Sequence, residues 1–469
     1  MVLSNLLQNV QNSLQVGLLL VAVLGIVVFV HELGHFLAAK SVGVTVLKFS
    51  LGMGPEIFGF TRGGTRYCLS WIPLGGFVQM AGDSPNEDGS LPTGGPEQFL
   101  THPWPGRIWI AVAGPLANLI TAYVVMVLMC LHGITQPDFP SVLGAVPDTS
   151  AAWQAGLREG DRVLSLGGKP VKTWHDMESI ADARNRKDSF AMAVERGTQT
   201  ITLELSADRS RPVLGGLEPQ ARPAIVGSLM TGMPAYRAGV QEGDRILAVD
   251  GHLVTRFDEI VGFVRPKVDK PVHLTLRRGQ STLEVNVTPI TAGGKSAAKD
   301  GVIGIEAPRG MTWTQRFGVL EAFKASFSGT GDLVKTVYAG MWLSISRPVY
   351  YHEYVGGPIF IAQMARDSAR KGLDQFLYFL AMINVAIMSF NLLPVPLLDG
   401  GHITLALLEA VRRRALSGRA YINFQKVGLV LVGTLFVLIL SKDIVRPFQR
   451  MHALDKAPRE TTTVAPSPH

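Results

Sequence analysis

Four long apolar stretches divide the chain, and each is long enough to cross a membrane as a helix. The pattern predicts transmembrane helices at 1–40, 106–132, 375–400 and 427–445, because about 20 helical residues span the hydrocarbon core of a bilayer. Polar residues or prolines interrupt the first and third stretches, which marks this pair as the one most relevant to function. No Lys or Arg precedes Lys40, which argues against a secretory signal peptide.

The segment between the first two apolar stretches, 41–105, alternates with a period of two. Leu47, Phe49 and Leu51 fall on one side of the chain, and glycines bound the alternating runs. This pattern is typical of a β-hairpin. We therefore expect a membrane-associated hairpin followed by a polar loop on the cytoplasmic side.

A repeat lies in the polar region between the second and third apolar stretches. AGLREGDRVLSLGG (Ala155–Gly168) aligns with AGVQEGDRILAVDG (Ala238–Gly251), and each copy follows a turn-rich strand signal. The pair resembles two PDZ domains, which we expect at 138–215 and 220–310. Two β-rich domains that bind no ligand are the alternative.

The PDZ resemblance also implies where peptides would bind. A short strand in each domain would form the groove that captures a free carboxyl terminus by strand addition. The domains would otherwise serve as a filter that excludes substrates with large external parts. The groove strands are expected to begin at Leu143 and Gly144 in the first domain and at Val226 and Gly227 in the second.

Composition indicates a chain that lies partly in a membrane. Apolar residues make up 47% of its 469 residues and charged residues only 17%, whereas soluble domains carry about 25% charged residues. The net charge of +7 does not indicate nucleic acid, because the basic residues are scattered apart from Arg412, Arg413, Arg414 and Arg419. Basic loops face the cytoplasm, which predicts a cytoplasmic hairpin loop, periplasmic PDZ domains and periplasmic termini. The two cysteines form no disulfide framework.

Two further segments complete the expected organisation. Bulky apolar residues mix with polar ones across 311–372, which predicts an amphipathic juxtamembrane segment on the membrane surface. The segment 446–469 is rich in Thr and Pro towards its end and is expected to be a flexible tail.

The motif HELGH lies inside the first apolar stretch. On a helix, His31 and His35 share one face and could ligate one zinc ion, with Glu32 beside it as general base. A carboxylate within a span is costly and functional by default. Catalytic zinc needs a third protein ligand, and the histidine that one known extension of the motif requires is absent, because Ser41 stands there. The best candidate is Asp399 in NLLPVPLLDGGH, where prolines break the third stretch.

These motifs together resemble the site-2 protease family of intramembrane zinc metalloproteases. HELGH, AGPLAN, NLLPVPLLDGG and the PDZ pair carry a resemblance that covers nearly the whole chain and is closest to the bacterial branch with tandem PDZ domains. It implies one Zn²⁺ per chain, bound by His31, His35 and Asp399, with Glu32 as base. The implied fold is an α-helical integral membrane protein of four transmembrane helices with a membrane-embedded β-hairpin, plus two β-rich PDZ domains.

The same resemblance implies how a substrate is held. Asn391 and Pro394 would sit in the substrate cleft, with Asn391 as a partner of the substrate backbone. A hairpin edge along 46–51 or 67–77 would add a strand to a locally unwound substrate helix, although a purely structural hairpin is the alternative. The hairpin residues expected to contact substrate are Leu47, Phe49, Leu51, Gly75, Gly76 and Phe77.

The implied substrates are single-span membrane proteins of the anti-sigma factor type, cut after a first external cleavage, and leftover signal peptides. The setting would be envelope stress signalling at the inner membrane of a bacterium. A catalytically idle scaffold that presents PDZ domains to envelope proteins is the alternative, and the intact Glu32 argues against it. A prenyl-protein endopeptidase would use a distant Glu as third ligand and offers no reason for the PDZ pair. His402 is interpreted as a structural neighbour of the ligand motif.

Overall fold

The protein consists of two compact units. One, the membrane unit, is formed mainly by Met1–His132 and Phe317–Phe448, and the other, the β-rich unit, mainly by Gly133–Ala292 and Ser296–Arg316. The computed structural model describes residues 2–86, 88–182, 190–205, 217–220, 222–291, 300–308, 310–346 and 356–456.

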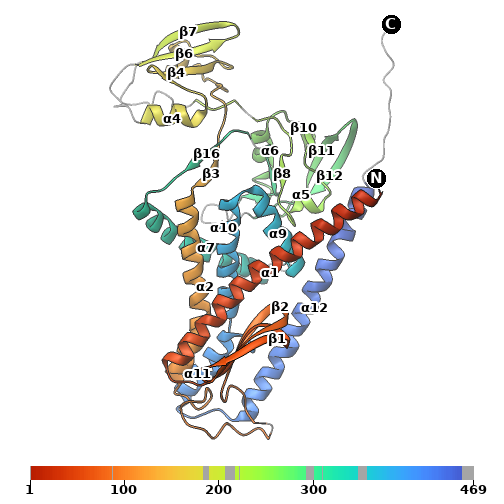
Figure 1. Ribbon diagram of the computed structural model, residues 1–469. Coiled ribbons are helices and arrows are strands. Elements are labelled where there is room, and N and C mark those ends of the chain that lie inside the picture. The colour runs from red at the N-terminus through yellow and green to blue at the C-terminus, as the bar shows by residue number, and fades with distance from the viewer. Residues whose placement is uncertain are drawn as a thin grey trace. The chain divides into compact units, whose positions relative to one another are not determined.

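Four helices of the membrane unit, among the residues described, are long and apolar enough to cross a bilayer (Figure 1). This agrees with the four spans predicted from the apolar stretches. The helices are α1 (Val2–Ser41), α2 (Trp104–His132), α10 (Leu373–Asn391) and α12 (Gly418–Lys456).

The ends of the last two spans differ from the prediction. The stretch 375–400 is not one helix, because α10 ends at Asn391 and a separate helix, α11 (Asp399–Arg412), begins at Asp399. Two prolines lie between them, and proline cannot continue a helix hydrogen-bond ladder. The helix α12 continues to Lys456, so the first part of the predicted tail 446–469 is helical, and 457–469 lie outside the described residues.

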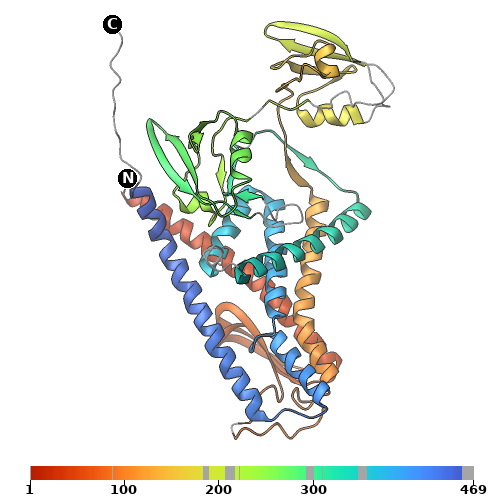
Figure 2. The same cartoon turned by 180° about the vertical axis from the view of Figure 1, so that it is seen from behind.

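The predicted hairpin is present as two long, irregular strands, β1 (Val46–Arg62) and β2 (Thr65–Met80). Both strands bend, so the beginning of β1 meets β2 twice. Residues 48–51 lie opposite 66–69 on one side and opposite 76–79 on the other. The sheet packs beside the C-terminal half of α1, as both views show (Figures 1 and 2).

This register decides which hairpin segments are edges. The end of β1, 56–62, pairs only with 65–70, so the two outer segments of the sheet are 56–62 and 76–80. The prediction of an edge along 46–51 was therefore wrong, because that segment has a neighbour on each side. Only the end of the predicted 67–77 segment belongs to an edge.

The predicted amphipathic segment 311–372 contains two helices, α7 (Val319–Ser346) and α9 (Pro358–Lys371). One face of α7 carries small buried residues, and Ser326 donates a hydrogen bond to the Cys130 sulfur of α2 at 3.5 Å. A second face is apolar and exposed, which is typical of a helix at a membrane surface. Its residues include Leu320, Phe323, Phe327, Trp342 and Ile345.

The β-rich unit contains two small domains of the same construction, which agrees with the sequence repeat. Each has a four-stranded antiparallel sheet, in the order β5-β4-β6-β7 in the first domain and β10-β9-β11-β12 in the second, and one main helix, α4 or α6. The bounds in the first domain are α3 (Ala151–Gln154), β4 (Arg162–Leu166), β5 (Lys169–Pro170), α4 (Trp174–Asp182), β6 (Phe190–Arg196) and β7 (Gln199–Leu205). Those in the second are α5 (Pro234–Arg237), β9 (Arg245–Val249), β10 (His252–Leu253), α6 (Phe257–Val264), β11 (Val272–Arg278) and β12 (Ser281–Val287).

Short strand pairs complete this unit. They join β16 to β3, β15 to β8 and β13 to β14. The ring of His175 stacks on Trp313 of β16 with centroids 3.5 Å apart, which fixes the first domain to the β3–β16 ribbon. The bounds are β3 (Ile134–Pro137), β8 (Ser228–Leu229), β13 (Ile290–Thr291), β14 (Gly301–Val302), β15 (Ile305–Glu306) and β16 (Thr312–Gln315).

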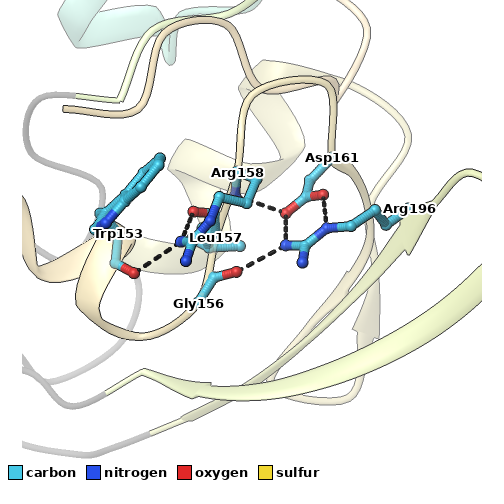
Figure 3. Close-up of polar contacts among 6 residues, drawn as sticks. All are labelled: Trp153, Gly156, Leu157, Arg158, Asp161 and Arg196. Atoms are coloured by element: carbon cyan, nitrogen blue, oxygen red, sulfur yellow. Dashed lines mark hydrogen bonds and ion pairs between the residues drawn. The ribbon is translucent and has the colours of Figure 1, made fainter. Parts of the chain in front are cut away.

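The repeated EGD motif builds the same ion pair in both domains, between a buried carboxylate and a partly exposed guanidinium. Asp161 is fully buried and accepts hydrogen bonds from the Arg158 backbone N–H and from both Nε and Nη2 of Arg196 (Figure 3). The same guanidinium donates to the Gly156 carbonyl at 2.7 Å (Figure 3). Asp244 and its arginine on β11 repeat these contacts in the second domain. A paired arrangement of this kind compensates the cost of burying the carboxylate.

Candidate zinc centre and substrate cleft

Three side chains singled out in the sequence meet where α1 lies next to the start of α11. His31 Nε2 is 3.1 Å from Asp399 Oδ2, and His35 Nε2 is 3.2 Å from Asp399 Oδ1. The two Nε2 atoms are 3.1 Å apart. One ligand atom from each residue lies within 4.8 Å of the others. The HELGH helix thus places both imidazoles on the face that receives the carboxylate.

The chemistry of this cluster fits a zinc ion. Two imidazole nitrogens that face each other cannot both present a lone pair unless a proton or a cation lies between them. Asp399 Oδ2 is buried and makes no hydrogen bond of acceptable geometry, although it lies close to His31. A cation at the centre would satisfy all three groups, and two nitrogens with one carboxylate oxygen form a donor set of catalytic zinc sites.

The helix α2 fixes the ring of His35. Its Nδ1 lies 2.7 Å from the carbonyl oxygen of Ile110, so Nδ1 carries the proton and Nε2 is left free for a metal. A Cβ atom at Gly114 would lie 2.3 Å from His35 Nε2. The glycine of the AGPLAN motif is therefore required for α2 to approach the imidazole.

Asn118, in the same motif, holds the other histidine. It is fully buried, and its side-chain Nδ2 lies 3.2 Å from His31 Nδ1 while its Oδ1 has no partner. If His31 offers Nε2 to a metal, its Nδ1 carries the proton, so a 180° turn of the amide gives Oδ1 as the acceptor. The sequence reasoning gave Asn118 no role of its own, although its place in the AGPLAN motif was noted.

Glu32 lies between the ligand cluster and the hairpin. Its side chain is partly buried, and Val78 of β2 lines the same cavity. A Cβ atom at Gly76 would come within 3.3 Å of Glu32 Cγ. The predicted base therefore stands next to the outer segment of the hairpin, 76–80.

The end of α10 brings a polar amide to the same place, and the loop that follows leads to Asp399. Asn391 Nδ2 lies 3.3 Å from His31 Nε2. Leu397 adopts a left-handed backbone conformation with φ 73°, which is uncommon for a leucine. Such strain is tolerated where the surrounding structure fixes the chain, often at functional sites. Here the turn directs Asp399 back towards α1.

A cavity of about 570 Å³ contains the ligand cluster. Of the predicted substrate residues, Asn391, Gly75, Gly76 and Phe77 line it, whereas Leu47, Phe49, Leu51 and Pro394 do not. Phe49 is a buried core residue whose ring contacts those of Phe29, Phe36 and Tyr67. The lining also includes Met53, Val78, Asp83, Ser84, His402 and Gln425, none of which was predicted to contact substrate.

The four residues expected to begin the peptide grooves are interior to their domains. Leu143 donates its N–H to Asp161 and accepts from Gly160, and Gly144 donates to Glu218. Val226 and Gly227 make equivalent bonds with the Asp244 turn and with Glu306. This expectation was wrong, because these backbone groups are already used. Among the residues described, the segments bonded beside them are 217–220 and 304–306, and the former lies beyond the predicted end of the first domain at residue 215.

The helices, the buried His-His-Asp cluster and the adjacent glutamate define a membrane-embedded metalloprotease. The profile of peptidase family M50 matches residues 19–435, and the chain belongs to this family. The chain is 31% identical over 441 residues to the regulator of sigma-E protease RseP of Salmonella typhimurium, covering 90% of this chain and 97% of the relative. It is 30% identical over 444 residues to the protease RseP of Yersinia pestis, covering 91% and 97%. The protein is thus a zinc metalloprotease with zinc as its cofactor.

Proposed function

We propose that the protein is an intramembrane endopeptidase that hydrolyses peptide bonds within the transmembrane segments of single-span membrane proteins. In this assignment His31, His35 and Asp399 bind the zinc ion and Glu32 is the catalytic base. The observation that carries the proposal is the convergence of three ligand atoms within 4.8 Å in a cavity between membrane helices. The sequence comparison supports the proposal, because the chain matches relatives named as proteases over nearly their whole length.

The catalytic steps follow from the position of each side chain. Zinc, when bound, supplies a Lewis acid that lowers the pKa of a coordinated water to about 7. Glu32 accepts the proton of the attacking water and later gives it to the leaving amine. The Asn391 amide, 3.3 Å from His31 Nε2, is placed to donate a hydrogen bond to the oxyanion that forms on the scissile carbonyl.

In a helical substrate the backbone carbonyl groups accept hydrogen bonds within the helix, so the helix must unwind before a peptide bond can be cut. The hairpin offers the unwound segment new backbone partners. The outer segment 76–80 lines the cavity beside Glu32. The backbone N–H of Met80 donates to the Asp83 carboxylate at 3.2 Å, so alternate N–H groups of this segment point away from β1. An unwound stretch of substrate would add to this edge as a further strand, which replaces the helix hydrogen bonds it has lost.

The orientation in the membrane follows from charge. Arg412, Arg413, Arg414 and Arg419 are all exposed around the connection between α11 and α12. Basic connections remain in the cytoplasm, so this side, with the zinc site near it, faces the cytoplasm of a bacterial inner membrane. The two small domains and both termini then lie in the periplasm.

The two repeat domains are proposed to be PDZ domains that admit substrates after a first external cut. A peptide would add beside 217–220 in the first domain, since the neighbouring strand is already paired. Substrates of the anti-sigma factor type and leftover signal peptides both present a single span with a short external remnant. These domains would either bind the new carboxyl terminus or exclude spans that still carry a large external part.

The deciding experiment compares zinc content and cleavage of a single-span model substrate in detergent. Wild-type protein should bind one zinc and cleave, Glu32→Gln should bind zinc without cleaving, and Asp399→Ala should lose both. Cleavage at the wild-type rate by Glu32→Gln contradicts the base assignment. A wild-type chain that binds zinc but cuts no membrane-spanning substrate would favour an idle scaffold.

A further inference from the structure

A buried polar cluster joins three helices away from the zinc ligands. It consists of Arg107 in the first turn of α2, Glu409 in the last turn of α11 and Tyr421 in the first turn of α12. Each of the three residues is at most 8% exposed. We call this group the Arg107 triad.

The hydrogen bonds of the triad form a closed ring. Arg107 Nη2 donates to Glu409 Oε2, and Arg107 Nη1 donates to the Tyr421 hydroxyl at 2.9 Å. That hydroxyl donates to Glu409 Oε1 at 3.1 Å, which also accepts the backbone N–H of Leu416 at 2.9 Å. The carboxylate therefore has three donors, while none of the three side chains lines the zinc cavity.

Burying the charged groups of the triad away from water costs free energy, so their presence requires an explanation. A buried ion pair is often no more stabilising than apolar residues of the same shape, although loss of one partner is strongly destabilising. Stability alone is thus a poor reason for its presence. Its directional bonds instead fix the relative position of the three helices.

Two of the three helices that the triad joins, α2 and α11, carry groups of the zinc site. Asp399 is the first residue of α11, ten residues before Glu409, and a helix of that length is a rod of about 15 Å. No helix connects Asp399 to α10, since the loop after Asn391 intervenes. The helix α2 carries Arg107 and, three residues later, Ile110. The backbone carbonyl of Ile110 orients the His35 ring.

We propose that the Arg107 triad is a positioning network that sets the distance between Asp399 and the two zinc-binding histidines. The α11 rod is held at its far end by Glu409, and α2 holds both the arginine and the backbone partner of His35. The triad touches neither substrate nor metal and acts through Asp399. The inference rests on the proposed role of Asp399 as the third ligand.

The test separates positioning from stability. The double variant Arg107→Met/Glu409→Gln removes the ion pair and keeps an amide oxygen for the Leu416 N–H and the Tyr421 hydroxyl, so metal-free protein should unfold at nearly the wild-type temperature. Its zinc dissociation constant, measured by competition with a chelator in detergent, should rise about tenfold, as for partners that orient metal ligands. A wild-type constant in the folded double variant overturns the proposal. Should this variant not fold, Tyr421→Phe decides the question, with an expected rise of about threefold from the loss of one hydrogen bond.

Two further arms identify the cause of any change. In an Asp399→Asn background the double variant should add no further loss of zinc affinity, because the network acts only through Asp399. If Asp399→Asn alone leaves the affinity unchanged, the third-ligand assignment fails instead of the triad. Asp443→Asn is the matched control, since Asp443 is a buried carboxylate near the other end of α12 that accepts backbone N–H groups of α9, and its loss should leave the zinc constant unchanged.

Discussion

The contact between Asn118 and His31 allows a quantitative test of how the zinc site is held. Asn118 is fully buried and lies 3.2 Å from His31 Nδ1. Leucine has nearly the same shape but no acceptor, so Asn118→Leu leaves the His31 N–H unsatisfied inside the membrane unit. Loss of such a partner weakens metal affinity by about 10- to 100-fold, which corresponds to about 1.4–2.8 kcal/mol. The orientation of His35 should be less sensitive to substitution of its partner residue, because that partner, Ile110, contributes a backbone carbonyl.

The assay is a chelator competition with purified protein in detergent, together with thermal unfolding of the metal-free form. Asn118→Asp keeps an acceptor oxygen and should bind zinc about as tightly as the wild type. Asn384→Leu is the control, because Asn384 is also fully buried and its amide donates to the Leu380 carbonyl at 2.8 Å, on α10. This control should leave the zinc dissociation constant unchanged.

Two results would refute the reasoning. An unchanged zinc constant in Asn118→Leu would show that the orientation of His31 does not depend on this asparagine. An equal loss in Asn118→Leu and Asn384→Leu would show that any buried asparagine in the membrane unit affects the site through folding. In either case the second-span motif would have no direct role at the metal.

Three further predictions concern the base, the hairpin and the second repeat domain. Glu32→Gln should retain zinc but lower kcat by about 10²- to 10⁴-fold, measured with a single-span substrate, and a smaller effect would point to another base. In a chain whose native cysteines are serines, Val78→Cys should cross-link to a cysteine within the substrate span while Ile57→Cys, on the opposite edge, should not; the reverse pattern contradicts strand addition at 76–80. Asp244→Asn should lower the stability of the second repeat domain by about 2 kcal/mol, because it weakens charge-assisted hydrogen bonds to a partly exposed arginine. Limited proteolysis of the full chain measures this loss, and the exposed Glu242→Gln should have no effect.

The part of the site that the sequence predicted is the part encoded locally. His31 and His35 are one helical turn apart, so any helix through HELGH places them on one face. Apolar length alone predicted four spans, and two prolines predicted that the chain breaks before Asp399. The motif combination also led to peptidase family M50, with which the profile match over residues 19–435 agrees.

The sequence did not predict which strand segments are open. Alternation of apolar and polar residues identifies a strand but not its neighbours. The pattern therefore predicted an edge at 46–51, whereas the structure places 66–69 on one side of this segment and 76–79 on the other. The same limit applies to the groove strands at Leu143 and Val226, which are covered by segments from far along the chain.

The sequence by itself determined the class of the protein, because the metal ligands and the membrane spans depend on residue type and short spacing. Only the tertiary structure decided how the ligands are held. Asn118 reaches His31 across 87 positions and Arg107 reaches Glu409 across 302, and one sequence carries no signal for such pairs. These contacts exist because α2 packs against both α1 and α11, and the geometry of that packing sets where zinc would meet the edge of the hairpin.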